Sequence, residues 1–153
     1  MIPKCKCKPF DSHFEFQHEQ RKIVTCSDSG STSAPKYLCK NTSKDYLSKY
    51  RVDGGLINDA GAKCDFLILN CNKHKSFFIE LKVSDIIRAI EQIDRSIDLL
   101  KDNLDDFSVF ARIVLTRVNT IELKDIKYLK LEKKVKQLNG DIIQQTRRME
   151  EVN

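Results

Sequence analysis

The hydrophobic pattern changes its period partway along the chain, and this change limits the folds that the sequence can adopt. Three short runs rich in apolar, β-branched and aromatic residues come first, at 50–57, 63–69 and 76–82. Polar turns separate them, so they predict a three-stranded antiparallel meander. Isoleucine and leucine then recur at steps of three and four, at Ile86, Ile90, Ile93, Ile97, Leu100 and Leu104. This spacing predicts one long amphipathic helix.

The remaining elements alternate between strand and helix patterns. Ser84 is placed to cap the start of the first helix. Residues 107–118 predict a strand, and the lysine-rich 120–138 predicts a helix that ends at Gly140. Residues 141–148 predict a last short strand at the sheet edge. The sequence therefore predicts an α/β fold whose central mixed sheet, an antiparallel three-strand meander followed by α-β-α-β, is flanked by helices.

The first part of the chain has a different character. It holds all three prolines, and its Ser/Gly-rich segment 27–36 predicts a loop. Residues 13–26 alternate weakly and suggest a strand that pairs with a later segment of the chain. We therefore divide the chain into an N-terminal extension over 1–44, without an assigned structure, and an α/β domain over 45–153.

Composition excludes some classes of protein. The net charge of +5 permits nucleic-acid binding without requiring it. No apolar run reaches the roughly 18 residues of a membrane helix, and the first residues lack the apolar core of a signal peptide. We therefore expect a cytoplasmic protein that does not bind membranes, with its six cysteines reduced.

Some of the cysteines are candidate metal ligands. Cys64 and Cys71 flank an apolar run and are expected in the core. Near the N-terminus, cysteines and the two histidines His13 and His18 have the residue types of a Zn²⁺ site, although the paired C-x2-C spacing is missing. The alternative is a set of buried or idle thiols. The four candidate zinc-binding cysteines are Cys5, Cys7, Cys26 and Cys39.

The tetrapeptide Ile-Glu-Leu-Lys occurs twice, at 79–82 and at 121–124. In the second copy, Asn119 precedes the helical pattern and Glu122 comes three residues later. This is the spacing of a capping box, in which the glutamate reaches back to the start of the helix. A structural role is therefore sufficient for the second copy.

The first copy lies on a predicted strand, where residues two apart share a face. Glu80 and Lys82 therefore stand on one face with Phe78. The other face carries Phe77, Ile79 and Leu81. Because both faces hold large apolar groups, we expect this strand to be covered on both sides.

Antiparallel pairing across the turn 70–75 brings Asp65 alongside Glu80. Two neighbouring carboxylates repel each other, so either one holds a proton or a divalent cation lies between them. Ligation by oxygen alone favours Mg²⁺ or Mn²⁺. With Lys82 beside it, such a site has the groups for metal-assisted hydrolysis of a phosphodiester. The alternative is a structural ion pair with a spare carboxylate.

These residues resemble the motif of the PD-(D/E)xK nuclease superfamily, which includes restriction endonucleases and archaeal Holliday-junction resolvases. The resemblance covers roughly residues 45–148 and implies a restriction-endonuclease-like core. It implies that Asp65, Glu80 and the backbone carbonyl of Leu81 ligate the metal. It also implies that Lys82 assists the attacking water.

The resemblance also implies secondary site residues. Some branches carry a glutamine on the helix after the motif, and Gln92 is placed to serve. The family usually has a further acidic residue before the first metal-binding strand. Asp53 or Asp45 could be this third acid, with Glu15 and Glu19 as more distant candidates.

Basic residues near the C-terminus could track a phosphate backbone. On the second helix they recur at steps of three and four, and an arginine pair lies beyond it. A solvated helix face is the usual alternative explanation. The candidate nucleic-acid contacts are Lys124, Lys127, Lys130, Lys134, Arg147 and Arg148.

Together the motif and its resemblance lead us to expect a Mg²⁺-dependent endonuclease that acts on DNA. Because a chain of this length covers few base pairs, we expect a homodimer or a partner protein that supplies specificity. The resemblance alone suggests a phage-defence, mobile-element or recombination setting. The alternative is a catalytically inactive nuclease-fold protein that binds a protein or a nucleic acid.

Overall fold

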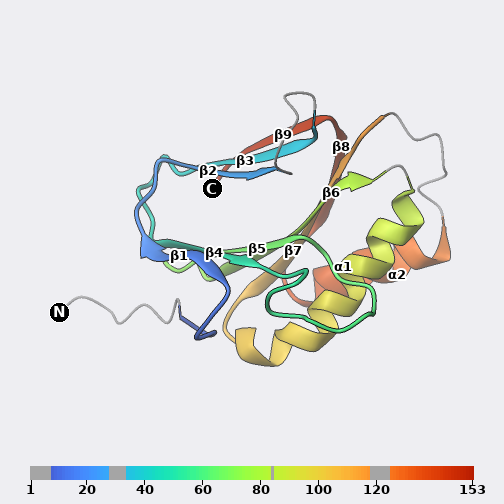
Figure 1. The fold of residues 1–153 in the computed structure, drawn as a ribbon, viewed down its shortest axis with the longest axis horizontal. Helices are drawn as coiled ribbons and strands as arrows, with labels where there is room; N and C mark the ends of the chain where they lie inside the picture. Colours follow the sequence, from blue (N-terminus) through green and yellow to red (C-terminus); the bar gives the residue numbers. More distant parts are fainter. Residues whose placement is uncertain (1–7, 28–33, 84, 118–124) are drawn as a thin grey trace.

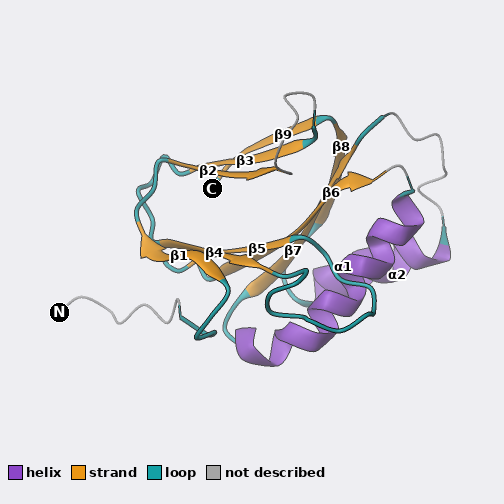
Figure 2. Cartoon of the chain, viewed as in Figure 1, coloured by secondary structure: helices purple, strands orange, loops and turns teal. Residues whose placement is uncertain are grey.

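Two β-sheets and a pair of helices form the layers of the molecule (Figures 1 and 2). The computed structural model describes residues 8–27, 34–83, 85–117 and 125–153, with Lys82 and Val83 described by their backbone alone. The larger sheet lies in the middle, the smaller sheet covers one of its faces, and α1 and α2 cover the other. Within the described residues, no helix has the length and apolar character needed to cross a membrane.

The larger sheet has six strands in the order β1-β4-β5-β6-β7-β8. Strands β4, β5 and β6 form the predicted antiparallel meander, and β7 and β8 continue the sheet in parallel. The predicted strand at the sheet edge is confirmed by β8, although it is not the last strand of the chain, since a further strand follows it in the smaller sheet. The bounds are β1 Phe14–Glu19, β4 Leu47–Arg51, β5 Phe66–Asn70, β6 Lys75–Val83, β7 Ser108–Leu115 and β8 Ile142–Thr146.

The smaller sheet joins segments from the two ends of the sequence. Strand β3 (Lys36–Lys40) pairs antiparallel with β2 (Ile23–Ser27) and parallel with β9 (Arg148–Val152). The predicted strand in 13–26 is split between the two sheets, because β1 pairs with β4 in the larger sheet. The boundary that we drew at residue 45 therefore runs through both sheets and separates no structural unit.

Helix α1 (Ile86–Leu100) comes directly after β6 and continues into a short 3-10 turn, η1 (Lys101–Leu104). Its cap is Asp85, whose Oδ1 accepts hydrogen bonds from the backbone N–H groups of Ile87 and Arg88. The prediction that Ser84 caps the helix was therefore wrong, although Ser84 itself lies outside the described residues.

Helix α2 (Ile126–Gln137) begins at Asp125, whose Oδ1 accepts from the Lys127 N–H at 2.8 Å. Asn119 and Glu122, the predicted capping box, lie outside the described residues. The helix ends at Gln137, and the left-handed φ that commonly follows a helix lies at Asn139, with a value of 65°, and not at Gly140, where we expected the helix-ending residue. Gly140 is needed for a different reason, since a Cβ there would lie 1.7 Å from the Val109 carbonyl oxygen.

The core has two parts, one on each face of the larger sheet. The isoleucine stripe of α1 packs on one face with Phe78, and the inner residues of α2 join it. The other face packs against the smaller sheet through Phe77, Ile79 and Leu81. The prediction that β6 is covered on both sides is confirmed. The bounds of the first predicted strand, 50–57, were wrong: only Tyr50 and Arg51 belong to β4, and the residues after them form a turn that carries the isolated bridge Asp53–Ile57.

Candidate active site

Two carboxyl groups meet at the end of the β5–β6 hairpin that lies away from its turn. Phe66 pairs with Ile79, so the preceding Asp65 lies opposite Glu80. The Asp65 N–H donates to the Ile79 carbonyl at 3.1 Å. In return, the Leu81 N–H donates to Asp65 Oδ2 at 2.9 Å. The predicted convergence of Asp65 and Glu80 is therefore confirmed.

Glu80 is almost fully buried, with 3% of its surface exposed. Burial raises the pKa of its carboxyl group from 4.5 to about 11, and the hydrogen bond to Asp65 and the charge of Asp65 act in the same direction. Glu80 therefore carries a proton at neutral pH when no cation is bound. Its Oε2 is buried and has no hydrogen-bond partner among the described residues. A buried oxygen without a partner is costly in a folded protein, and a water, a ligand or an ion would satisfy it.

Asp53 lies next to this pair on the turn after β4. The neighbouring Val52 N–H donates to the Asp65 carbonyl at 2.9 Å, which ties the turn to the start of β5. The charge of Asp53 contributes to the raised pKa of Glu80. Asp53 itself is exposed, and its Oδ1 lies 3.8 Å from Nζ of Lys63. Of the acids proposed to complete the site, Asp53 is the one close enough to affect Glu80.

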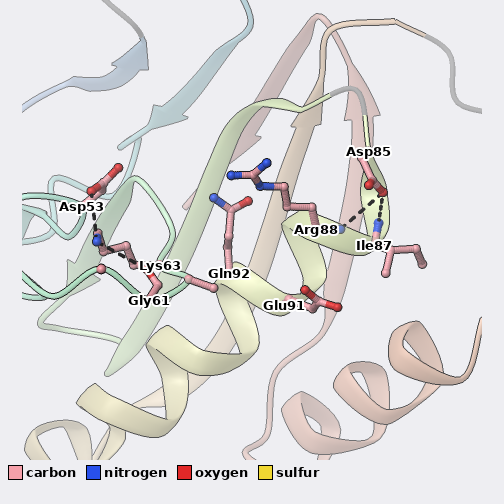
Figure 3. A pocket seen from close by; sticks show the side chains of 10 residues that line it. Asp53, Gly61, Lys63, Asp85, Ile87, Arg88, Glu91 and Gln92 are labelled. Carbon is pink, nitrogen blue, oxygen red and sulfur yellow. Dashed lines mark hydrogen bonds and ion pairs between the residues drawn. The ribbon is translucent and has the colours of Figure 1, made fainter.

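A pocket of about 550 Å³ opens between the turn that carries Asp53 and the first turns of α1. Figure 3 shows Arg88 and Gln92 extending from α1, with Asp53 and Lys63 on the facing side. Polar and charged groups dominate its lining, as expected for a site that binds a charged ligand. The lining includes Asp53, Lys63, Arg88 and Gln92, whereas Asp65 and Glu80 are not among the residues that line the pocket.

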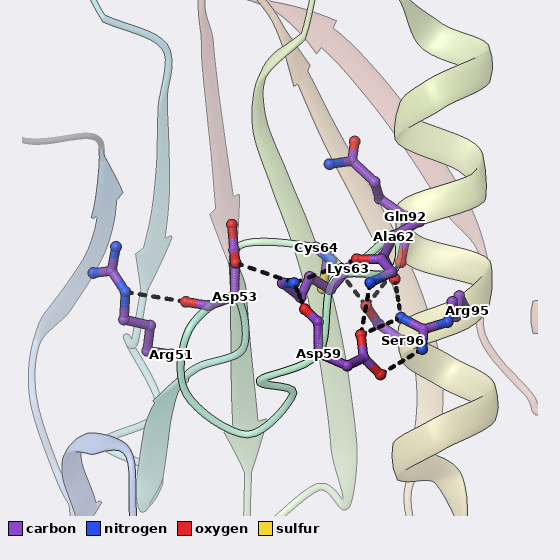
Figure 4. Close-up of polar contacts among 10 residues, drawn as sticks. Arg51, Asp53, Asp59, Ala62, Lys63, Cys64, Gln92, Arg95 and Ser96 are labelled. Atoms are coloured by element: carbon purple, nitrogen blue, oxygen red, sulfur yellow. Dashed lines mark hydrogen bonds and ion pairs between the residues drawn. The ribbon is translucent and has the colours of Figure 1, made fainter.

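Gln92 reaches the pocket because a buried serine fixes the helix beside Asp65. Ser96 Oγ accepts from the Cys64 N–H at 2.8 Å and donates to the Gln92 carbonyl at 2.7 Å (Figure 4). The residue before Asp65 is thereby attached to the turn of α1 that holds Gln92.

The end of β6 contains an irregularity. Leu81 pairs with Val114, whereas Val83 pairs with Leu115, so Lys82 is an extra residue on the β6 side. This is the pattern of a β-bulge, which re-aims side chains and is frequent beside active sites. The side chain of Lys82 lies outside the described part of the structure. The Leu81 side chain packs between the sheets, so only its backbone is available to the site.

Asp45 does not reach the site. It is buried at the other end of the hairpin, where its Oδ2 accepts from Asn70 at 2.9 Å and lies 3.2 Å from Lys73 Nζ. The suggestion that Asp45 is the third acid was therefore wrong. Glu15 and Glu19 belong to the edge strand β1 and form ion pairs of their own, with Lys49 and Arg21.

The predicted basic stripe on α2 is partly used in packing. Lys127 is paired with Glu91 on α1, and Lys134 is paired with Asp94 and Asp98. These two lysines thus face α1, because acidic residues of that helix lie opposite them. The other candidates have different surroundings: Lys130, Arg147 and Arg148 are exposed, Arg148 pairs with Glu150, and Lys124 lies outside the described residues.

The cysteines give no metal cluster in the described part of the chain. Cys26 and Cys39 are buried between the sheets, and burial raises the pKa of each thiol to about 12. Zinc binds thiolates, so these protonated groups are poor ligands. No described group of three or more His, Cys, Asp or Glu side chains is arranged to hold an ion. Cys5 and Cys7 lie outside the described residues.

The remaining predictions for cysteines and histidines were partly confirmed and partly wrong. Cys64 and Cys71 are buried, as predicted. Cys71 is disulfide-bonded, so the expectation that all cysteines are reduced was wrong. His18 stacks on Tyr46 with ring centroids 4.1 Å apart, and His13 is exposed.

Lys63 and Arg88 line the pocket and were not among the predicted site residues. Arg88 precedes Gln92 by four residues, so the two share a helix face and both reach the pocket. That spacing was visible in the sequence. Lys63 has no comparable signal, because its position depends on the path of an irregular loop.

Comparison of the chain with protein-family models, with characterised proteins and with solved structures found no match.

Proposed function

We propose that the protein is a Mg²⁺-dependent endonuclease of the PD-(D/E)xK type, with a restriction-endonuclease-like core, that hydrolyses phosphodiester bonds in DNA. One observation carries the proposal. Asp65 and Glu80 form a carboxyl pair with an orphaned buried oxygen, Glu80 Oε2, at the end of a central strand.

The residues present fit a hard divalent cation. Both side chains offer oxygen, which Mg²⁺ and Mn²⁺ prefer. A cation between the carboxyl groups would satisfy Oε2 and replace the proton on Glu80, since positive charge favours the ionised form. The Leu81 carbonyl is the further ligand that we propose. When bound, Mg²⁺ supplies Lewis-acid activation of the phosphodiester and of the attacking water.

The surrounding residues have distinct proposed roles. Lys82 orients the water or stabilises the negative charge that develops on the phosphorus oxygens. Gln92 and Arg88 hold the substrate, because both extend into the pocket from α1. Asp53 adds negative charge on the facing wall, which strengthens cation binding.

The size of the chain bears on the partners. A chain of 153 residues would contact only a short stretch of DNA. We propose that a second copy or another protein supplies specificity, and that exposed basic residues such as Lys130 and Arg147 contact the backbone. The superfamily resemblance suggests a phage-defence, mobile-element or recombination setting.

A second candidate is a nuclease-fold protein without activity that binds a protein or a nucleic acid. The specific observation in its favour is that Asp53 faces Lys63, which leaves two converging carboxyl groups in the described site. A site with two acidic ligands and an internal ammonium holds a cation less tightly than a site with three.

Cleavage assays separate the two candidates. Supercoiled, linear and branched DNA would be incubated with the purified chain in Mg²⁺, Mn²⁺ or EDTA. We expect metal-dependent cleavage that Glu80→Gln lowers at least about 100-fold. Glu132→Gln, a matched change on α2, should cleave like the wild type. If the wild type and Glu80→Gln are equally inactive on every substrate while DNA or protein binding persists, the binding protein is the better account.

A further inference from the structure

One arginine fixes the loop that carries Asp53 to helix α1. Arg95 donates from Nη1 to Asp59 Oδ1 at 3.0 Å and from Nη2 to Asp59 Oδ2 at 2.5 Å (Figure 4). Nη1 also donates to the Ala62 carbonyl at 2.9 Å. A two-point contact with a carboxylate, extended to the backbone, sets both the direction and the distance of the loop.

The loop sequence is fitted to the guanidinium group. A Cβ on Gly61 would lie 2.3 Å from Nη1 and 2.4 Å from Cζ of Arg95, so glycine leaves the space that the side chain occupies. The Gly61 N–H donates to Asp59 Oδ1 at 2.8 Å. The hydrogen bonds from Arg95 lower the pKa of Asp59 to about 2, so the pair stays charged throughout the neutral range.

Lys63 connects this contact to the pocket. Its side chain is 15% exposed, and its Nζ donates to the carbonyls of Asp59 and Gly61. The same Nζ lies 3.8 Å from Asp53 Oδ1. The ammonium group therefore stands between the part of the loop that α1 holds and the carboxylate on the pocket wall.

We propose that Arg95 and Asp59 are a positioning pair that holds the loop 52–63, so that Lys63 keeps the Asp53 carboxylate on the pocket wall, where its negative charge strengthens cation binding by the neighbouring carboxyl pair. The inference rests on the proposed function, because the charge of Asp53 acts on the cation that Asp65 and Glu80 would hold. Neither member of the pair lines the pocket, so both act through the loop.

The test uses the full chain and three measurements. Mn²⁺ affinity is measured by calorimetry, kcat and KM with a cleaved DNA, and amide hydrogen exchange over 53–63. Arg95→Met and Asp59→Asn should each weaken Mn²⁺ binding about tenfold and lower kcat with little change in KM. Exchange in the loop should become at least about fivefold faster. The double variant should be no worse than either single one, because the two residues act as a unit.

Two further variants sharpen the test. Arg95→Lys keeps the charge without the two-point contact and should recover only part of the loss. Arg21→Met removes an exposed arginine of similar exposure that pairs with Glu19, at 3.2 Å, outside the pocket. It should match the wild type. The proposal is overturned if Arg95→Met behaves like Arg21→Met, or if the effects of the two single variants add.

The failure of this proposal is distinguishable from the failure of the nuclease. If the wild type neither binds Mn²⁺ nor cleaves DNA, the nuclease is refuted, and the role given to Asp53 is refuted with it. If the wild type does both and Asp53→Asn changes neither, only the positioning role is refuted. If Asp53→Asn and Arg95→Met lower kcat together and loop exchange rises in Arg95→Met, both proposals are supported.

Discussion

The Leu81 N–H donates a hydrogen bond to Asp65 Oδ2 at 2.9 Å, and because of this bond the register of the β5–β6 hairpin determines where the Asp65 side chain points. The backbone bond from Asp65 N–H to the Ile79 carbonyl lies directly beside it. A slip of one residue between β5 and β6 would turn Asp65 or Glu80 to the opposite face. The apolar packing on both faces of β6 opposes such a slip, so the core holds the carboxyl pair together.

Glu80→Gln should change how stability depends on pH. Between about pH 4.5 and 11 the folded chain holds a proton on Glu80 that the unfolded chain has lost, because the folded pKa is raised by burial and by Asp65. The wild type therefore loses stability as pH rises through this window. In EDTA, we expect the variant to melt at least about 3 °C higher than the wild type at alkaline pH, with the difference vanishing near pH 4.5. If the difference in melting temperature between the variant and the wild type stayed constant across this pH range, the raised pKa of Glu80 would be contradicted.

Asp65→Asn and Asp65→Ala should separate the charge of Asp65 from its hydrogen bond. The asparagine oxygen can still accept from Leu81 N–H, whereas alanine leaves that donor without its partner. Alanine should therefore cost about 1–3 kcal/mol of unfolding free energy and asparagine less. Both should lose Mn²⁺ binding, since both lack a carboxylate. Denaturant unfolding and calorimetry measure the two effects, and equal stability of the two variants would count against the role of the bond.

Ser96→Ala should destabilise the protein through the Cys64 N–H. This donor is buried and bonds to Ser96 Oγ, so the variant leaves it unpaired at a cost of about 1–3 kcal/mol. Ser43→Ala, at an exposed serine, should stay within about 0.5 kcal/mol of the wild type. Unfolding by urea measures both. A cost for Ser96→Ala no larger than that of the control would show that the attachment of α1 to the start of β5 is weak.

Among these variants, Arg112→Met should lower the free energy of unfolding the most without affecting the metal site. Arg112 is 3% exposed and lies 2.6 Å from Asp141 and from Glu151. Its loss leaves Glu151 mostly buried without the cation, at about 3–5 kcal/mol. Mn²⁺ affinity of the folded fraction should not change, because the ion pairs of Arg112 are with Asp141 and Glu151, neither of which is a proposed metal ligand. A large loss of affinity without destabilisation would contradict this separation.

The parts of the fold that local patterns determine were predictable. The turn 70–75 and the two-residue period of strands together place Asp65 opposite Glu80, and the isoleucine stripe marks α1. Ser84 and Asp85 are adjacent, and both residue types cap helices well, so the sequence pattern did not distinguish between them as the cap of α1. Such a choice depends on where the strand ends, which the pattern leaves open.

The parts that depend on distant pairing were not predictable. Asp45 and Asp53 are both acidic residues close to β4. Only the path of the chain places Asp53 near Glu80 and Asp45 at the other end of the β5–β6 hairpin, beside its turn. Lys127 and Lys134 look like a solvated stripe until the acids of α1 are set opposite them. Likewise, nothing in β1 indicates that it pairs with β4 while β2 joins another sheet.

Strand β3 lies between β2, its close neighbour in sequence, and β9, which ends at Val152. When roughly the first two-thirds of the chain have been synthesised, β3 can pair with β2 but β9 has not yet been made. The smaller sheet is therefore incomplete at that stage. Contacts so far apart in sequence form slowly, and exposed strand edges invite association between nascent chains. Synthesis of this protein thus passes through a stage in which the edge of β3 that later pairs with β9 is uncovered.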